Sequence, residues 1–469
     1  MEKSDKNILV VLVINCCLLC VGHAYSSFLV IAASLTLFLF ILLASGYKMF
    51  LPVVLFHIPF VQLLRFNANS FSFFSLGIIM LFFWEICFRT TRLRYLPKKM
   101  IVPIAGICLY IVSIGLFRGM IPNVSLIMTL CQFVMVPLIA YHCKEHIRFR
   151  PCVFYLATGV ILACVLSLIF QDYGTMKPFI EVAHADVADA ARICGFTGDG
   201  NRMGAQTLAA MCAVIVLQLS DKGKNVIRYV VLLMLLLCCG MLTVSKMFLL
   251  EAVFLILLWS LAFFSQKGLF RKKIGLVICI VLVVCVVMST GIVNTQIDIY
   301  IRRFSLATDA SGLTTGRTDL WKIYLDYLLE KLDVLLVGRG WMAEYLYYWG
   351  EAKNMAPHNI FFEVVYRLGI VGAVFLIVWI TVTCRSCVPD SSSKNPIPAT
   401  IRIIVLVGFF GSWLAIPAID FDEFFFFPLL AVHAIYGYEG NTYKNPVDYV
   451  CDDPKEDMSY EKKADPHCL

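Results

Sequence analysis

The stretch of residues 294–358 holds the residues best suited to chemistry. It is the longest polar interruption in an otherwise apolar chain. Guanidinium groups bind phosphate oxygens through paired hydrogen bonds, and an imidazole can accept a proton near neutral pH. The stretch therefore combines anion binding with a candidate general base. Its basic residues are Arg302, Arg303, Arg317, Arg339 and His358.

Further basic residues precede this stretch, at Arg192, Arg202 and Lys246. Lys246 lies between two apolar segments with hardly any loop, in the sequence M-L-T-V-S-K-M-F-L-L. An ionisable group so close to hydrocarbon is costly and marks a candidate functional site, although a lysine can also extend its amine to the interface. Solvation, or contact with headgroup phosphates, is the alternative for the other cations. A converging set would stabilise a pyrophosphate leaving group, without a metal.

Two other polar groups leave alternatives open. His358, followed by Asn359, is either a general base or a helix-cap histidine. Asp420, Asp422 and Glu423 form a tight acidic group, for which an interfacial loop is favoured over a divalent-metal site. The 19 cysteines stand mostly alone within apolar runs, so we predict neither a zinc site nor a disulfide framework.

Composition indicates an integral membrane protein. The chain has 469 residues, of which 60% are hydrophobic and 15% are charged, and its mean hydropathy is +0.82. Soluble domains contain roughly 25% charged residues. The net charge of +7 comes from short clusters between apolar runs, which is typical of membrane orientation signals and not of nucleic-acid binding. We predict an all-α polytopic fold of about 12–14 membrane-spanning helices.

Basic loops follow every second predicted span, which places both chain ends in the cytoplasm. A helix is expected over 316–331, lying along the membrane surface, and Gly338 and Gly340 predict a tight turn. The spans at 49–64 and 423–438 are short or contain proline, and are expected to be re-entrant or tilted. The resulting organisation is transmembrane helices over 1–293 with an outer loop at 171–202, a large outer loop at 294–358, transmembrane helices over 359–438 and a cytoplasmic tail at 439–469.

Six short motifs occur in an order that resembles the O-antigen ligase and polymerase superfamily over roughly 190–380. Each motif alone is weak, but the ordered set, with a large outer loop before the His-Asn pair, is fairly specific. The motifs are C-G-F-T-G-D-G-N-R-M-G (194–204), M-L-T-V-S-K (241–246), T-G-R-T-D-L-W (315–321), L-V-G-R-G-W (336–341), P-H-N-I-F-F-E (357–363) and L-G-I-V-G (368–372).

The resemblance implies a GT-C-type membrane glycosyltransferase that needs neither metal nor cofactor. Such an enzyme takes an oligosaccharide from undecaprenyl pyrophosphate at the outer face of the bacterial cytoplasmic membrane, with inversion. Arg317 and His358 would be catalytic, His358 by deprotonating or orienting the acceptor hydroxyl. The pyrophosphate would be held by Arg317 with Lys246, Arg202, Arg339, Arg192 and Arg303. Supporting residues would be Asn359, Glu363 and Asn201.

The chain departs from the family pattern twice. Lys246 stands where the family usually has arginine, which keeps the charge but loses the paired hydrogen bonds. Arg367 stands near a position where glutamate is common, and Glu363, one helical turn earlier, is the candidate substitute.

A polymerase that joins repeat units is the favoured activity, and a ligase that transfers polysaccharide to lipid A–core is the alternative. A flippase for lipid-linked oligosaccharide and a non-catalytic scaffold are rivals from other classes. Transporters are often built from repeated halves, and no internal repeat is evident here. Expected partners are the lipid-linked oligosaccharide, membrane lipid, and a chain-length regulator and flippase of the same pathway, with no nucleic acid.

Overall fold

The computed structural model describes residues 2–67, 70–88, 97–180, 192–221, 225–265, 273–274, 292–305, 316–346, 354–389 and 398–438. Within them the regular structure is helical, which confirms the all-α polytopic membrane fold. The predicted tail 439–469 lies outside the described residues, as does most of the predicted span 274–293.

Eight described helices are long and apolar enough to cross a membrane. The lengths suit a hydrocarbon layer that needs ~17–25 residues per helix. They are α1 (Lys3–Ala24), α2 (Phe28–His57), α4 (Lys98–Phe117), α5 (Val124–Cys143), α6 (Phe149–Phe170), α7 (Gly200–Ser220), α9 (Lys246–Ser265) and α15 (Ile360–Ser386).

Shorter apolar segments complete the bundle. The predicted short span at 49–64 is the second arm of α2, because the helix breaks at Gly46, where φ is 61°. This arm continues through the 3-10 turn Ile58–Phe60. The others are α3 (Phe73–Phe88), α8 (Val226–Leu242), α16 (Ala399–Phe410) with the 3-10 turn Gly411–Leu414, and α17 (Glu423–Tyr438).

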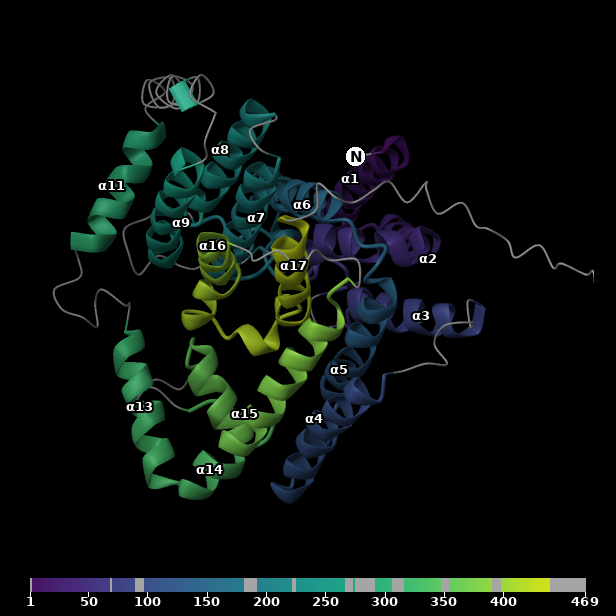
Figure 1. The fold of residues 1–469 in the computed structure, drawn as a ribbon, viewed down its shortest axis with the longest axis vertical. Helices are drawn as coiled ribbons and strands as arrows, with labels where there is room; N and C mark the ends of the chain where they lie inside the picture. The colour runs from purple at the N-terminus through teal and green to yellow at the C-terminus, as the bar shows by residue number, and fades with distance from the viewer. Residues whose placement is uncertain are drawn as a thin grey trace, which may run out of the picture.

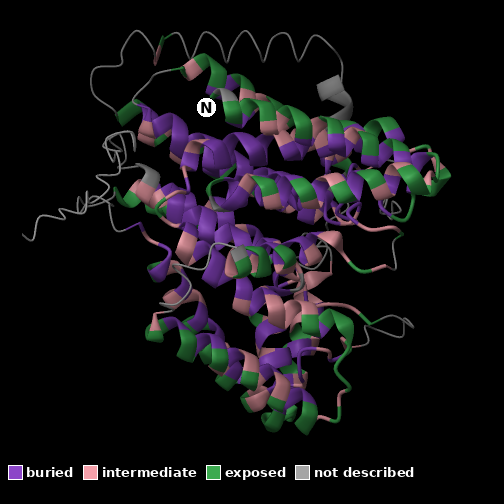
Figure 2. Cartoon of the chain, turned by 90° about the vertical axis from the view of Figure 1, so that its right-hand side faces the viewer, coloured by how far each residue is buried: buried purple, intermediate pink, exposed green. Residues whose placement is uncertain are grey.

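Helix α7 is the centre of the bundle. In its most apolar stretch, 94% of the residues are buried, against 67% for α6, the next most buried span. It packs against α6, α8, α9, α16 and α17, and Figure 1 shows it among them. The buried residues in Figure 2 concentrate in this interior, while exposed residues cover the outer faces. Small residues such as Gly204, Ala205 and Ala209 allow neighbouring helices to approach closely.

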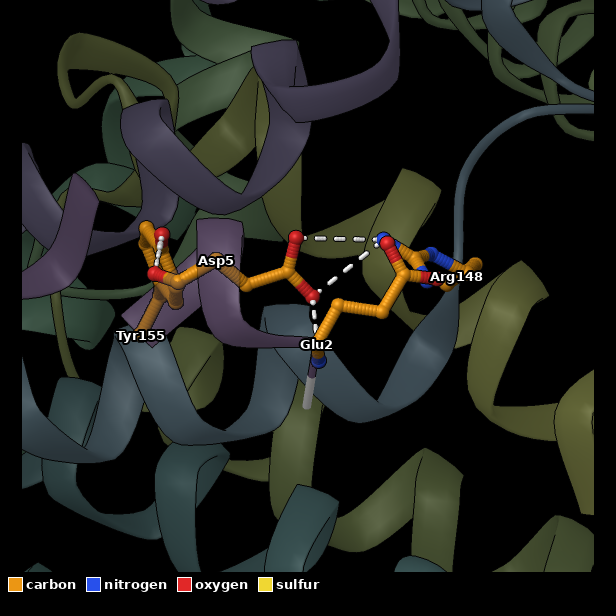
Figure 3. A network of polar contacts seen from close by, with 4 residues as sticks. All are labelled: Glu2, Asp5, Arg148 and Tyr155. Atoms are coloured by element: carbon orange, nitrogen blue, oxygen red, sulfur yellow. Dashed lines mark hydrogen bonds and ion pairs between the residues drawn. The ribbon is translucent and has the colours of Figure 1, made fainter. Parts of the chain in front are cut away.

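A polar network joins the start of α1 to the start of α6 (Figure 3). The sequence predicts that these two helix starts face the cytoplasm. Arg148 Nη2 lies 3.2 Å from both carboxylate oxygens of Asp5, and Arg148 Nη1 also pairs with Glu2. Tyr155 Oη donates a 2.7 Å hydrogen bond to the Asp5 carbonyl oxygen. Asp5 is buried, so this pairing satisfies a charge that would otherwise be costly.

The predicted helix over 316–331 is α13 (Arg317–Glu330), which buries Leu320, Tyr324 and Leu328. It is followed by α14 (Leu332–Val337), and both pack against α15 at the end of the molecule opposite α8 in Figure 1. Whether α13 lies along the membrane surface stays a prediction.

The predicted turn at Gly338–Gly340 is confirmed, and it fits into a break in α15. The backbone N–H groups of Arg339 and Gly340 donate to the carbonyl oxygens of Tyr366 and Arg367, at 2.9 and 2.8 Å. Helix α15 breaks at Gly369, where φ is 65°. A side chain there would collide with a carbonyl oxygen of α14. Glycine at 369 is therefore required both by the conformation and by the close approach.

Candidate functional site

The loop before α7 forms one wall of the site. Gly195 and Gly198 have φ of 58° and 73°, a left-handed conformation that glycine adopts readily. Asp199 is the N-cap of α7, and its Oδ1 accepts a 2.8 Å hydrogen bond from the backbone N–H of Asn201. The positive end of the α7 dipole therefore points toward this loop.

The turn between α8 and α9 forms the second wall. Val244 has φ of 50°, which is strained for a β-branched residue. Hydroxyl groups hold this turn: Thr243 Oγ1 donates to the Gly240 carbonyl oxygen at 2.7 Å, and Ser245 Oγ donates to Asn201 Oδ1 at 2.8 Å. The second bond joins the motif 241–246 directly to the start of α7.

Arg192 connects the two walls. Its Nε donates a 3.1 Å hydrogen bond to the Thr243 carbonyl oxygen, while its buried Nη2 has no hydrogen-bond partner among the described residues. Gly200 leaves room for this packing, since a Cβ there would lie 2.8 Å from Arg192 Nη2 and 3.0 Å from the Thr243 carbonyl oxygen.

Arg317 and His358 complete the cluster from the other side. Arg317 is the first residue of α13, and His358 precedes α15. Each lies close enough to Asp199 for an electrostatic interaction, and Arg317 interacts in the same way with Arg192 and His358. Residues that are far apart in the sequence are thus gathered around the positive end of α7. We call Arg192, Asp199, Arg317 and His358 the cationic cluster.

The backbone of His358 is held in an unusual conformation. Its φ is 48°, in the left-handed region that few non-glycine residues adopt, and such strain often occurs at functional sites. Trp321 Nε1 donates a 2.9 Å hydrogen bond to the carbonyl oxygen of Pro357 on one side. On the other side Asn359 is the N-cap of α15, accepting a 2.9 Å bond from the backbone N–H of Phe361. The backbone on both sides of His358 is therefore held in place.

Electrostatics favour a neutral imidazole in this cluster. Burial and the Arg317 cation lower the pKa of His358, and Asp199 partly opposes them. Its buried Nδ1 has no hydrogen-bond partner among the described residues. Burial also lowers the pKa of Arg317, which nevertheless stays protonated because guanidinium is so weak an acid. A neutral base beside a half-buried cation suits proton acceptance near a bound anion.

Lys246 lies at the edge of the cluster, directly after Ser245. Its Nζ is 5.4 Å from the ring centroid of Phe304, on α11 (Ile292–Ser305). Tyr300 of the same helix donates a 3.3 Å hydrogen bond to the Met241 carbonyl oxygen. The side chain of Arg303 lies outside what the structure describes.

Arg202 and Arg339 have other partners. Arg202 forms a buried two-bond ion pair with Glu423, through Nε at 2.7 Å and Nη2 at 2.8 Å. Arg339 Nη1 donates a 2.7 Å hydrogen bond to Tyr327 Oη, within the packing of α13 against α15. Arg202 therefore braces α7 against α17, and Arg339 braces the turn after α14.

Glu363 and Arg367 pair with each other on one face of α15. Both are buried, and Arg367 Nη2 lies 3.7 Å from Glu363 Oε1. The Tyr345 hydroxyl donates a 3.0 Å hydrogen bond to the same Glu363 oxygen and also contacts Arg367. Arg367, which departs from the family pattern, is thus neutralised within the chain by Glu363.

Sequence reasoning missed Asp199, Thr243, Ser245 and Trp321. The signal for Asp199 was present, because an aspartate before G-N-R at the start of an apolar run is an N-cap pattern. The indole N–H of Trp321 holds the residue before His358, a role that its position in the motif 315–321 does not reveal. Among the described residues, no group of three or more His, Cys, Asp or Glu side chains is arranged to hold a metal ion.

The fold and the cluster define a multi-pass, all-α membrane protein with a half-buried cationic site beside a histidine whose pKa is lowered. Residues 230–377 match the family described as O-antigen ligase, Wzy_C, which confirms the resemblance to the O-antigen ligase and polymerase superfamily. The match includes Lys246, Arg317 and His358, and it begins after Arg192 and Asp199. No curated protein matches the chain. This match, over residues 230–377, supports a function of the O-antigen ligase or polymerase type, and the apolar helices support a place in the membrane.

Proposed function

We propose that the chain is a surface-polysaccharide polymerase. It joins oligosaccharide repeat units that are carried on undecaprenyl pyrophosphate, at the outer face of the bacterial cytoplasmic membrane. The observation that carries the proposal is the meeting of Arg192, Arg317 and His358, from three separate parts of the chain, around the start of α7. Holding two cations close together in a half-buried site is unfavourable unless an anion joins them, and Asp199 supplies only one negative charge.

The pyrophosphate of the donor is the anion that this cluster fits. Arg192 offers a buried Nη2 that no described residue binds, and Arg317 offers a guanidinium in which partial burial strengthens charge–charge interactions. Lys246 adds a further charge at the edge. Together with the positive end of α7, these groups stabilise negative charge on the leaving group.

In the transfer step, the acceptor hydroxyl oxygen attacks the anomeric carbon from the face opposite the pyrophosphate. The bond between that carbon and the pyrophosphate oxygen breaks, and its electron pair stays on the pyrophosphate beside Arg317. The hydroxyl proton passes to the neutral imidazole of His358. Because attack and departure occur on opposite faces, the anomeric configuration inverts. A general base of this kind contributes typically 10²–10⁴-fold to a rate.

The proposal is tested with the purified chain in liposomes that contain the lipid-linked repeat unit. Arg317→Ala and His358→Ala should abolish chain extension while the variants still insert and stay folded. Lys322→Ala is the matched control, because Lys322 is an exposed cation on the same helix as Arg317. Undiminished extension by both Arg317→Ala and His358→Ala would reject the proposal.

The family description itself favours a second candidate, a ligase that transfers polysaccharide to lipid A–core. The same assay separates the two activities by the acceptor. A polymerase lengthens the lipid-linked chain and releases undecaprenyl pyrophosphate without lipid A–core, whereas a ligase releases it only when lipid A–core is added. A flippase would release none under either condition.

A further inference from the structure

A second polar space lies beside the cationic cluster. It is a cavity of about 180 Å³ between α5, the turn after α14, α15 and the segment that leads into α17. A single water needs only ~10–15 Å³, so the cavity has room for a much larger ligand. Its lining includes Ser125, Thr129, Gln132, Trp341, Arg367 and Asp422.

The charged groups of this cavity are largely compensated by the protein. Arg367 is paired with buried Glu363. Asp422 Oδ1 accepts a 2.8 Å hydrogen bond from Gln132 Nε2, and the carboxylate interacts electrostatically with Arg202 and Arg65. Burial and the neighbouring Glu423 carboxylate nevertheless raise the pKa of Asp422, so a ligand that brings further negative charge is disfavoured here. A ligand that is polar but uncharged fits this balance best.

The remaining lining combines flat apolar walls with hydrogen-bonding groups. Trp341 and Phe425 supply aromatic surface, and Ser125, Thr129 and Asp422 supply hydroxyl and carboxylate oxygens. A carboxylate offers about four acceptor positions, of which Gln132 occupies one. A pyranose ring has the complementary chemistry, because C–H groups cover its faces and hydroxyl donors surround its rim. Binding pockets commonly join aromatic walls to a few converging polar groups in this way.

We propose that this cavity binds an uncharged sugar ring of the carbohydrate substrate. The proposal rests on the proposed function for the identity of that substrate. Arg202 interacts with both Asp422 and Asp199, so the cavity adjoins the cationic cluster. Arg367 lies seven residues into α15 from Ile360, roughly 10 Å along the helix at ~1.5 Å per residue, and His358 lies just before that helix. The cavity therefore holds a sugar next to the one that reacts, and it selects which repeat unit is accepted.

The direct test is ligand-observed NMR on the full-length protein in detergent. The probes are methyl glycosides of neutral hexoses and N-acetylhexosamines, compared with methyl glycosides of uronic acids. At least one uncharged glycoside should bind saturably, and more tightly than the uronic acids. Asp422→Asn should weaken that binding about tenfold, which is ~1.4 kcal/mol, since a neutral amide oxygen accepts more weakly than a carboxylate.

Two further variants keep the test decisive. Ser125 is exposed at the rim of the cavity, so Ser125→Trp should block binding without disturbing the fold. Arg317→Ala lies outside the cavity and should leave glycoside binding unchanged, even where it abolishes chain extension. Saturable binding only of uronic acids, no binding of any glycoside, or binding that Ser125→Trp leaves intact would each overturn the sugar site. Intact sugar binding with undiminished extension by Arg317→Ala and His358→Ala would instead reject the proposed function alone.

Discussion

Trp321 Nε1 donates a 2.9 Å hydrogen bond to the carbonyl oxygen of Pro357, which joins the helix that begins at Arg317 to the residue before His358. Arg317 and Trp321 are four residues apart on α13, so they lie on the same face of that helix. The same face of α13 therefore places Arg317 in the cationic cluster and, through Trp321, holds the backbone next to His358. This arrangement explains how two motifs 36 residues apart act as one unit.

Removing that bond should slow chain extension without unfolding the protein. Trp321→Phe keeps an aromatic ring against Phe362, whose centroid lies 6.3 Å away, but loses the indole N–H. The lost hydrogen bond contributes ~0.5–1.5 kcal/mol, so the extension rate should fall about two- to tenfold. Tyr327→Phe is the comparison, because it removes the bond to Arg339 from the same helix. Equal rates for wild type and Trp321→Phe would show that the Pro357 bond does not position His358.

The pH dependence of extension should report the lowered pKa of His358. A base with a lowered pKa stays neutral to more acidic pH, so the rate should hold as pH falls through about 6.5, the ordinary value. The rate should then decline as pH passes through the lowered pKa and the imidazole becomes protonated. An NMR titration of His358 gives the pKa directly, and Arg317→Gln should raise it by removing the adjacent cation. An unchanged His358 pKa in Arg317→Gln would contradict the contact.

The buried Arg202–Glu423 pair should matter for stability. Glu423→Ala leaves the Arg202 guanidinium buried without its partner, which typically costs ~3–5 kcal/mol and should lower the Tm clearly in detergent. The double variant Arg202→Met, Glu423→Ala should recover part of this loss, since no uncompensated charge remains. Asp333→Ala is the control, because Asp333 is 60% exposed in its pair with Arg118 and such pairs contribute only ~0–1 kcal/mol. Similar Tm losses for Glu423→Ala and Asp333→Ala would contradict the prediction that the buried Arg202–Glu423 pair matters more for stability than the exposed pair.

Gly369→Ala should disrupt the fit between α14 and α15. The residue has φ of 65°, and an added Cβ would collide with the carbonyl oxygen of Leu336. We expect a lower yield of folded protein and loss of extension, because the turn at Gly338 packs against the same break. Gly115→Ala on α4 is the matched control, since a Cβ there meets nothing within 4 Å. Wild-type yield and activity of Gly369→Ala would mean that the break can relax.

The sequence by itself determined the class of protein and the residue types of the site. Long apolar runs require membrane-spanning helices, because backbone groups in hydrocarbon must bond within the helix, and the structure confirms this fold. The spacing of Leu320, Tyr324 and Leu328 predicted α13, and the glycines at 338 and 340 predicted the turn. Lys246 was recognisable because cations are rare next to hydrocarbon, and Arg317 and His358 because they stand in the longest polar interruption of the chain.

Only the tertiary structure decided which cations share a site. Arg192, Arg202 and Arg339 look alike in the sequence, yet Arg192 joins the cluster, Arg202 is paired with Glu423, and Arg339 bonds to Tyr327. Helix packing sets these partners, over separations of more than 200 residues in the case of Arg202 and Glu423. Local periodicity carries no information about such distances. The cavity beside Trp341 and Asp422 was equally invisible, because a cavity is what remains between elements after they have packed.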